Sequence, residues 1–163
     1  MENKTEKEQR FTTIIECNRQ LIYKVCYMYA TDDAHFKDLY QEVLINLWKG
    51  LDHFRGESQL STWIYRTCIN TCVSVYRKNH KYDEMLSLEG VSVVDSDDGT
   101  RLQQLREMYG LINRLDRMEK AIILLWLDEK SYDEISEITG MSRNNVASRL
   151  RRIKIKLQQL SEE

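Results

Sequence analysis

The sequence predicts an all-α fold with two small helical domains joined by a flexible acidic linker, the second domain holding a helix-turn-helix. The 163 residues include no proline, which favours long uninterrupted helices over turn-rich sheets. Apolar residues recur at helical spacing on both sides of residues 81–104, which show no sustained periodicity. That segment holds two Lys or Arg against six Asp or Glu, whereas the flanking parts are nearly balanced in charge.

The N-terminal domain is expected to span residues 1–80 and to contain three strong helices. Its first apolar stripe runs from Phe11 to Val25, its second from Phe36 to Trp48 and its third from Leu60 to Val75. A loop around Gly56 separates the second stripe from the third. Each stripe would bury one face of its helix against the other two.

The C-terminal domain is expected to span residues 105–163. Asp116 and Ser131 are each followed three residues later by glutamate, which is the spacing of a capping box and predicts that a helix begins at each. Ser142 is the natural N-cap of the last helix, two residues beyond the glycine of the turn. In the last helix, steps of four and three define the buried face: Val146, Leu150, Ile153, Leu157 and Leu160.

Positive charge is concentrated on that last helix. No acidic residue lies between Ile138 and Ser161, although the whole chain has a net charge of -2. Such a helix suits phosphate binding, and the first turns of the second helix of a helix-turn-helix enter the major groove of DNA. A solvated basic face is the alternative, but the adjacent caps and glycine turn favour DNA binding. Asn and Arg can bond base edges bidentately. The candidate DNA-reading residues are Arg143, Asn144, Asn145, Ser148, Arg149 and Arg152.

Two surfaces of the N-terminal domain are further candidates. On the helix from Phe36, Ile45 falls among polar residues opposite the aromatic stripe, which suggests a protein-docking face, although single exposed apolar residues are common. Residues 54–78 interleave aromatic and basic side chains, a pattern that suits single-stranded nucleic acid. Simple packing of Trp63 and the tyrosines in the core is the alternative. One side of this helix carries Trp63, Arg66, Asn70, Ser74 and Arg77.

Neither a cofactor nor a metal ion is expected. The four cysteines form no CxxC pair, and no histidine has ligand-like spacing to them, so we expect buried, reduced, structural cysteines. No glycine-rich phosphate loop or His-Cys-carboxylate constellation supports an enzyme. The chain lacks a run of about 18 apolar residues and an apolar signal core, so we expect a cytoplasmic protein without direct membrane insertion.

Several of these segments together resemble one protein family. Residues 38–49, residues 54–66, Asn70 and the pair Arg77-Lys78 resemble region 2 of the extracytoplasmic-function class of bacterial RNA polymerase sigma factors. The C-terminal helix-turn-helix, including residues 146–152, resembles their region 4. The order of the motifs and the linker between them fit this class. The resemblance implies a sigma factor that binds core RNA polymerase and directs promoter recognition, DNA melting and transcription initiation.

The resemblance also implies roles for particular residues. The last helix would read the minus-thirty-five element, the linker would thread towards the RNA exit channel, and an anti-sigma factor is an expected partner. The loop from Phe54 would hold a flipped base of the minus-ten element. The face that would dock on the clamp helices of the largest polymerase subunit comprises Asp38, Gln41, Glu42 and Ile45. The minus-ten residues would be Phe54, Arg55, Gly56, Glu57, Ser58, Trp63, Arg66, Asn70 and Arg77.

The chain departs from the family pattern at Ser74, Asn145 and Ala147, and it has Leu115-Asp116 where Leu-Pro is frequent. The resemblance therefore fixes the expected architecture but not the base preference. The main rival is an ordinary helix-turn-helix transcriptional regulator that binds duplex DNA without polymerase, with the N-terminal domain used for dimerisation or sensing. An enzyme with incidental basic helices is a second rival.

Overall fold

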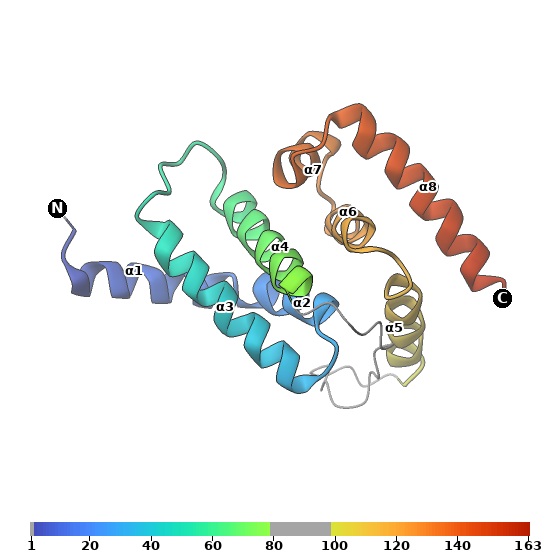
Figure 1. The fold of residues 1–163 in the computed structure, drawn as a ribbon, viewed down its shortest axis with the longest axis horizontal. Helices are drawn as coiled ribbons and strands as arrows, with labels where there is room; N and C mark the ends of the chain where they lie inside the picture. Colours follow the sequence, from blue (N-terminus) through green and yellow to red (C-terminus); the bar gives the residue numbers. More distant parts are fainter. Residues whose placement is uncertain (1, 79–98) are drawn as a thin grey trace.

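The computed structural model describes residues 2–78 and 99–163, and every regular element in these two ranges is an α-helix (Figure 1). Helices α1 to α4 form the N-terminal domain and α5 to α8 form the C-terminal domain. Their bounds are α1 Lys4–Cys17, α2 Arg19–Tyr29, α3 Asp33–Leu51, α4 Leu60–Lys78, α5 Gly99–Ile112, α6 Arg117–Leu127, α7 Tyr132–Thr139 and α8 Arg143–Ser161.

The first expected helix is two helices, because the chain breaks at Asn18. The Asn18 side-chain amide donates to the carbonyl of Ile14 at 2.9 Å, and its backbone N–H reaches the carbonyls of Ile14 and Ile15. An asparagine that bonds back to the preceding turn competes with continuation of the helix. The apolar periodicity runs across the break, so it could not reveal it. α1 buries no residue completely and packs through Phe11, edge-on to Trp48 at 5.2 Å between ring centroids.

The core of the N-terminal domain lies between α2, α3 and α4, which contact one another pairwise. The expected stripe of α3 is confirmed by the burial of Leu39, Val43 and Leu47. That of α4 is confirmed at Ile64, Cys68 and Cys72, and the side chain of Val75 lies outside the described residues. α3 begins at its N-cap Asp32, whose carboxylate accepts from the backbone N–H of His35 at 2.7 Å. The buried residues at the centre of these helices include Ile22, Val25, Leu39, Val43, Leu47, Ile64 and Cys68.

In the C-terminal domain the starts of α6, α7 and α8 were predicted correctly. Asp116 and Glu119 form a capping box, and Ser142 accepts from the backbone N–H of Asn145. Ser131 caps α7, but the reciprocal half of the expected box is missing, because the carboxylate of Glu134 accepts from the Ser131 hydroxyl instead of the backbone. The stripe of α8 is confirmed, with Val146, Leu150 and Ile153 buried and Leu157 and Leu160 partly buried.

Most of the expected linker, residues 81–104, lies outside the described residues. Its end does not: α5 begins at Gly99, so residues 99–104 are helical. The two domains that this segment connects pack against each other, with α4 against α7 (Figure 1). The Tyr29 hydroxyl donates to the carbonyl of Arg117 at 2.6 Å, and Tyr27 meets Tyr109 edge-on at 5.6 Å. The buried residues of both domains consequently form one continuous core.

Candidate nucleic-acid interface

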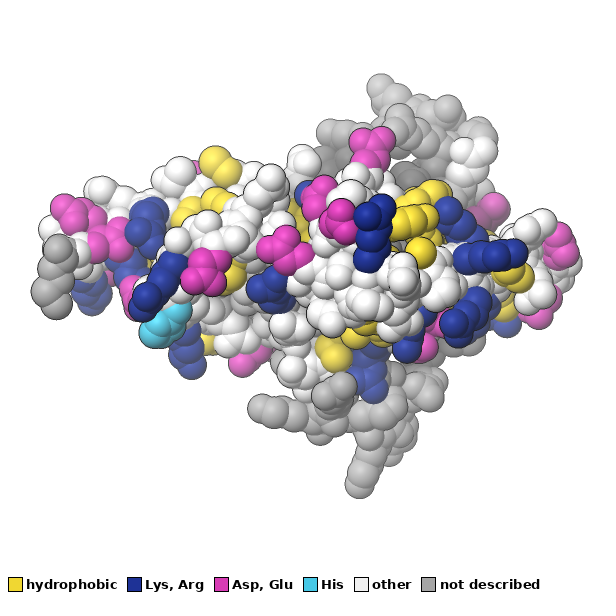
Figure 2. All heavy atoms as spheres, turned by 90° about the horizontal axis from the view of Figure 1, so that it is seen from above, with side chains coloured by type: hydrophobic (Ala, Val, Ile, Leu, Met, Phe, Trp, Pro, Cys, Tyr) yellow, Lys and Arg dark blue, Asp and Glu magenta, His cyan; other side chains and the backbone are white. Residues whose placement is uncertain are grey.

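The start of α8 presents a polar and basic face to solvent. Burial of Val146, Leu150 and Ile153 fixes how the helix is rotated, because these residues hold it against α6 and α7. Figure 2 views the molecule from the side where α8 begins. Several Lys and Arg side chains, in dark blue, lie over the right-hand part of this view. Arg149 is half-buried. The exposed candidates are Arg143, Asn144, Asn145, Ser148 and Arg152.

Helices α7 and α8 meet in the turn that a helix-turn-helix requires. Gly140 ends α7 with a φ of 78°, in the left-handed region where a residue with a side chain is strained. Two of the exposed side chains on α8 already have partners. The Arg143 Nε lies 3.6 Å from a carboxylate oxygen of Asp133, and the Ser148 hydroxyl donates to the carbonyl of Asn144 at 3.0 Å. Both contacts are at the surface, so they can be exchanged for a ligand at small cost.

The loop between α3 and α4 is open to solvent at its tip and anchored by aromatic rings at its base. Phe54 lies 5.0 Å from Trp63 between ring centroids, and Trp63 in turn packs on Gly50, where an added Cβ would come within 3.1 Å of the indole. Gly56 has a φ of 73°. Trp63 is therefore half-buried: it packs at the edge of the core and also keeps part of its ring at the surface. At the tip Arg55, Gly56 and Glu57 are exposed and Ser58 is half-buried.

Along α4 the predicted residues have different surroundings. Asn70 is exposed, and its side chain makes no hydrogen bond within the described part of the chain. Arg66 is half-buried, and its guanidinium donates to the backbone carbonyl of Glu137 at 2.7 Å, so it contacts α7 of the other domain. The side chain of Arg77 lies outside the described residues. The structure thus brings Arg66, but not Asn70, into contact with the helix-turn-helix.

The predicted docking face lies on α3, opposite the buried stripe. Asp38, Gln41 and Glu42 are exposed, and Ile45 keeps 45% of its surface open to solvent although it stands in the middle of a long helix. On the opposite side of α3, Leu39 and Val43 are completely buried. An exposed isoleucine framed by two carboxylates and an amide is an arrangement suited to a partner with both apolar and basic groups.

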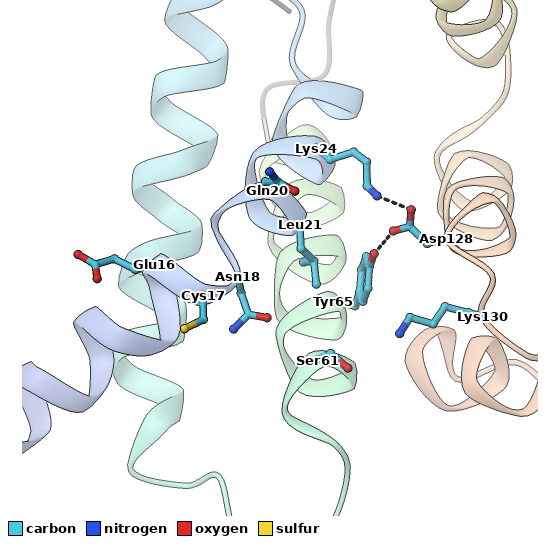
Figure 3. A pocket seen from close by; sticks show the side chains of 10 residues that line it. All are labelled: Glu16, Cys17, Asn18, Gln20, Leu21, Lys24, Ser61, Tyr65, Asp128 and Lys130. Atoms are coloured by element: carbon cyan, nitrogen blue, oxygen red, sulfur yellow. Dashed lines mark hydrogen bonds and ion pairs between the residues drawn. The ribbon is translucent and has the colours of Figure 1, made fainter. Parts of the chain in front are cut away.

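Sequence reasoning missed a polar cluster between the domains. Asp128, at the end of α6, accepts from Lys24 of α2 and from the hydroxyl of Tyr65 of α4 (Figure 3). Lys130 lies 5.5 Å from the centre of the Tyr65 ring. These residues are far apart in the chain, and each has an ordinary place in its own helix. No signal in the sequence could have linked them.

Three cysteines are buried as expected, Cys26, Cys68 and Cys72, whereas Cys17 is exposed. All four are free thiols. Burial raises the pKa of Cys68 well above its usual value, which disfavours the reactive thiolate. Within residues 2–78 and 99–163 no three His, Cys, Asp or Glu side chains are grouped closely enough to hold a metal ion. None of the described helices is long and apolar enough to cross a membrane.

Two parts of the chain, one in each domain, match known protein families. Residues 14–82 match sigma-70 region 2, and residues 105–157 match sigma-70 region 4. The chain is 32% identical over 130 residues to RNA polymerase sigma factor YlaC of Bacillus subtilis (strain 168), covering 74% of each chain. It is 26% identical over 159 residues to ECF RNA polymerase sigma factor SigW of the same organism, covering 89% of this chain and 85% of the relative.

Solved structures share the fold. The sigma factor RpoE of Bartonella quintana, in complex with the anti-sigma factor NepR, superposes with a TM-score of 0.70 at 21% identity, covering 95% of this chain and 96% of that one. CnrH in complex with the cytosolic domain of CnrY superposes with a TM-score of 0.69 at 18% identity, covering 95% of this chain and 89% of that one.

Proposed function

Since this chain belongs to the extracytoplasmic-function class of RNA polymerase sigma factors and directs promoter recognition, we propose which of its surfaces perform each step. The first turns of α8 read the minus-thirty-five element as duplex DNA. The 54–59 loop and α4 hold the minus-ten element as separated strand. The Asp38, Gln41, Glu42 and Ile45 face of α3 docks on the clamp helices of the largest subunit of core polymerase.

The domain boundaries follow the same division. Residues 1–80 act as region 2, residues 105–163 act as region 4, and residues 81–104 connect them. The matched ranges, 14–82 and 105–157, support this division. We further propose that the protein works in the cytoplasm, because its polymerase and promoter are there, and that it acts as a binding factor rather than an enzyme.

The observation that carries the proposal is the division of α8 into two faces. Val146, Leu150 and Ile153 are almost completely buried, whereas Asn144, Asn145 and Ser148 are exposed within the first two turns. Those turns are the part of a recognition helix that enters the major groove. Asn144 and Asn145 offer amide groups that match an adenine edge. Farther along, Arg151 is exposed on a face suited to the phosphate backbone.

For the minus-ten element, the support is the combination of an exposed loop tip and an anchored base. The Phe54 and Trp63 rings hold the loop, so that Arg55, Gly56 and Glu57 at its tip are placed without being covered, beside the half-buried Ser58. Trp63, Arg66 and Asn70 continue from there along α4, and Arg77 is proposed from its sequence position alone. Aromatic, basic and amide groups in this order suit a separated strand.

A regulatory partner is also proposed. The two superposed sigma factors were solved in complexes, RpoE with the anti-sigma factor NepR and CnrH with the cytosolic domain of CnrY. They superpose on almost the whole length of this chain. We therefore expect an anti-sigma factor for this chain too.

The recognition role of α8 can be tested with single alanine variants in the holoenzyme. Asn144→Ala, Asn145→Ala and Ser148→Ala are expected to change promoter preference in a randomised minus-thirty-five library, each costing about 1–3 kcal/mol at one position. Arg151→Ala is expected to weaken all sequences alike and to lower the salt slope of binding by about one.

Gln159→Ala is the matched control, because Gln159 is exposed on the same helix but lies in its last turns. It should leave both preference and affinity unchanged. If the three variants at the start of α8 also leave promoter preference unchanged, while transcription remains sigma-dependent, then α8 is not the reading element.

A further inference from the structure

The contacts between the two domains engage a residue that strand opening is proposed to use. We propose that in the free chain the C-terminal domain holds α4 closed through an interdomain latch, formed by Lys24, Tyr65 and Arg66 of the N-terminal domain with Asp128 and the end of α7. Release of this latch would free Arg66 for its proposed role in promoter opening. The functional consequence rests on the proposed role of Arg66, whereas the latch itself does not.

The first half of the latch is the contact of Arg66 with α7. The last carbonyls of a helix have no partner within the helix and form its partially negative end. Glu137 lies in the last turn of α7, and the Arg66 guanidinium donates to its carbonyl at 2.7 Å. The cation therefore caps α7 as a basic residue of the same helix would. While it does so, this group cannot hold a nucleic-acid phosphate in the same geometry.

The second half of the latch is centred on Asp128. Its two carboxylate oxygens accept from different helices of the N-terminal domain, one from Lys24 and the other from the Tyr65 hydroxyl (Figure 3). The side chains of Asp128 and Lys24 are 20% and 31% exposed, so the pair is partly shielded from water. Hydrogen bonds to a charged group are the stronger kind, and here two of them join the domains at one residue.

The interface beside Asp128 is open, although the buried residues of the two domains join in one core elsewhere. A cleft of about 600 Å³ opens there, lined by the α1–α2 junction, by Ser61 and Tyr65 of α4, and by Asp128 and Lys130 (Figure 3). Polar contacts next to an open cleft can be exchanged for water when the domains separate, which is typical of interfaces that move. The closed arrangement at this side therefore depends on a few named groups.

The latch can be tested on the free, full-length chain by measuring the distance between the domains. Spin labels would be placed at Glu8→Cys on α1 and Gln158→Cys on α8, both exposed, with the exposed Cys17 replaced by serine. The parent chain is expected to show one narrow distribution of distances. Asp128→Ala is expected to raise the ratio of open to closed molecules by about tenfold, because it removes both hydrogen bonds.

Three further variants make the result specific. Lys24→Gln removes one partner only and should open the chain less than Asp128→Ala. The exchange of Lys24→Glu with Asp128→Lys restores an ion pair and should restore the narrow distribution of the parent chain. Asp52→Ala is the matched control, because it breaks the Lys7–Asp52 pair, 2.7 Å long, within the N-terminal domain. It should leave the distance unchanged.

The proposal is overturned if the free parent chain is already mostly open, or if Asp128→Ala gives the same distribution as Asp52→Ala. If Asp128→Ala fails to fold, its helical circular dichroism signal will be lost. The Lys24→Gln variant and the charge-exchange variant would then test the latch in its place. These distances involve neither DNA nor polymerase. They therefore test the latch even if Arg66 proves to have no part in strand opening.

Discussion

Arg66 and Asn70 lie about one turn apart on α4, yet the C-terminal domain engages only Arg66. The guanidinium of Arg66 meets the negative end of α7, where a cation is stabilised by the free carbonyls. The side-chain amide of Asn70 is exposed and has no hydrogen-bond partner in the described part of the chain. A variant of Asn70 therefore isolates the role of α4 on DNA, whereas a variant of Arg66 changes the domain interface as well.

At this scale we predict that Asn70→Ala lowers promoter melting more than it lowers closed-complex formation. Loss of a contact to a separated base is expected to cost about 1–3 kcal/mol. Permanganate reactivity of thymines in the minus-ten element measures melting, and filter binding at low temperature measures the closed complex. Gln104→Ala, which truncates an exposed amide on α5, is the control. An equal loss of melting and closed complex would contradict the role.

Among the helices, α3 shows a clear separation between a buried face and an exposed face. It buries Leu39, Val43 and Leu47 against α2 and α4, and it presents carboxylates and Ile45 to solvent. Substitutions on the exposed face leave the buried stripe intact. Binding can therefore change without loss of fold.

We predict that Asp38→Arg combined with Glu42→Arg weakens binding to core polymerase. Each lost charged contact is expected to cost about 2–5 kcal/mol if the interface excludes water there. Glu107→Arg combined with Glu162→Arg makes the same change in net charge at exposed sites on α5 and after α8, and it should bind normally. Core affinity can be measured by fluorescence anisotropy of a labelled chain. Normal affinity in a folded Asp38 and Glu42 double variant would show that the docking face lies elsewhere.

At the scale of the whole molecule, local patterns predicted the elements but not how they meet. The stripes of α3 and α8 and the caps at Asp116 and Ser142 were predicted because each depends on residues within a few positions of one another. The break at Asn18 was not, since the apolar spacing continues across it. The contacts of Asp128 with the other domain join residues 63 and 104 positions apart, so no local pattern contains them.

The candidate binding surfaces also include features that the sequence could predict and features that it could not. Exposure of Ile45, Asn144 and Asn145 follows from the buried stripes of their own helices and could be predicted. The engagement of Arg66 by Glu137 could not, because it depends on how α4 lies against α7. A sequence pattern shows which face of a helix is free of its own domain, but not which face is covered by the neighbouring domain.

The central claim is that this chain selects promoters as part of a polymerase holoenzyme. The most direct measurement is run-off transcription from a randomised promoter library by bacterial core RNA polymerase, with and without the purified chain. We predict new start sites that share two sequence elements and that appear only when chain and core are combined. These start sites should be lost with the Asp38 and Glu42 double variant. Unchanged start sites, together with tight sequence-specific duplex binding by the chain alone, would contradict this claim and identify an ordinary regulator.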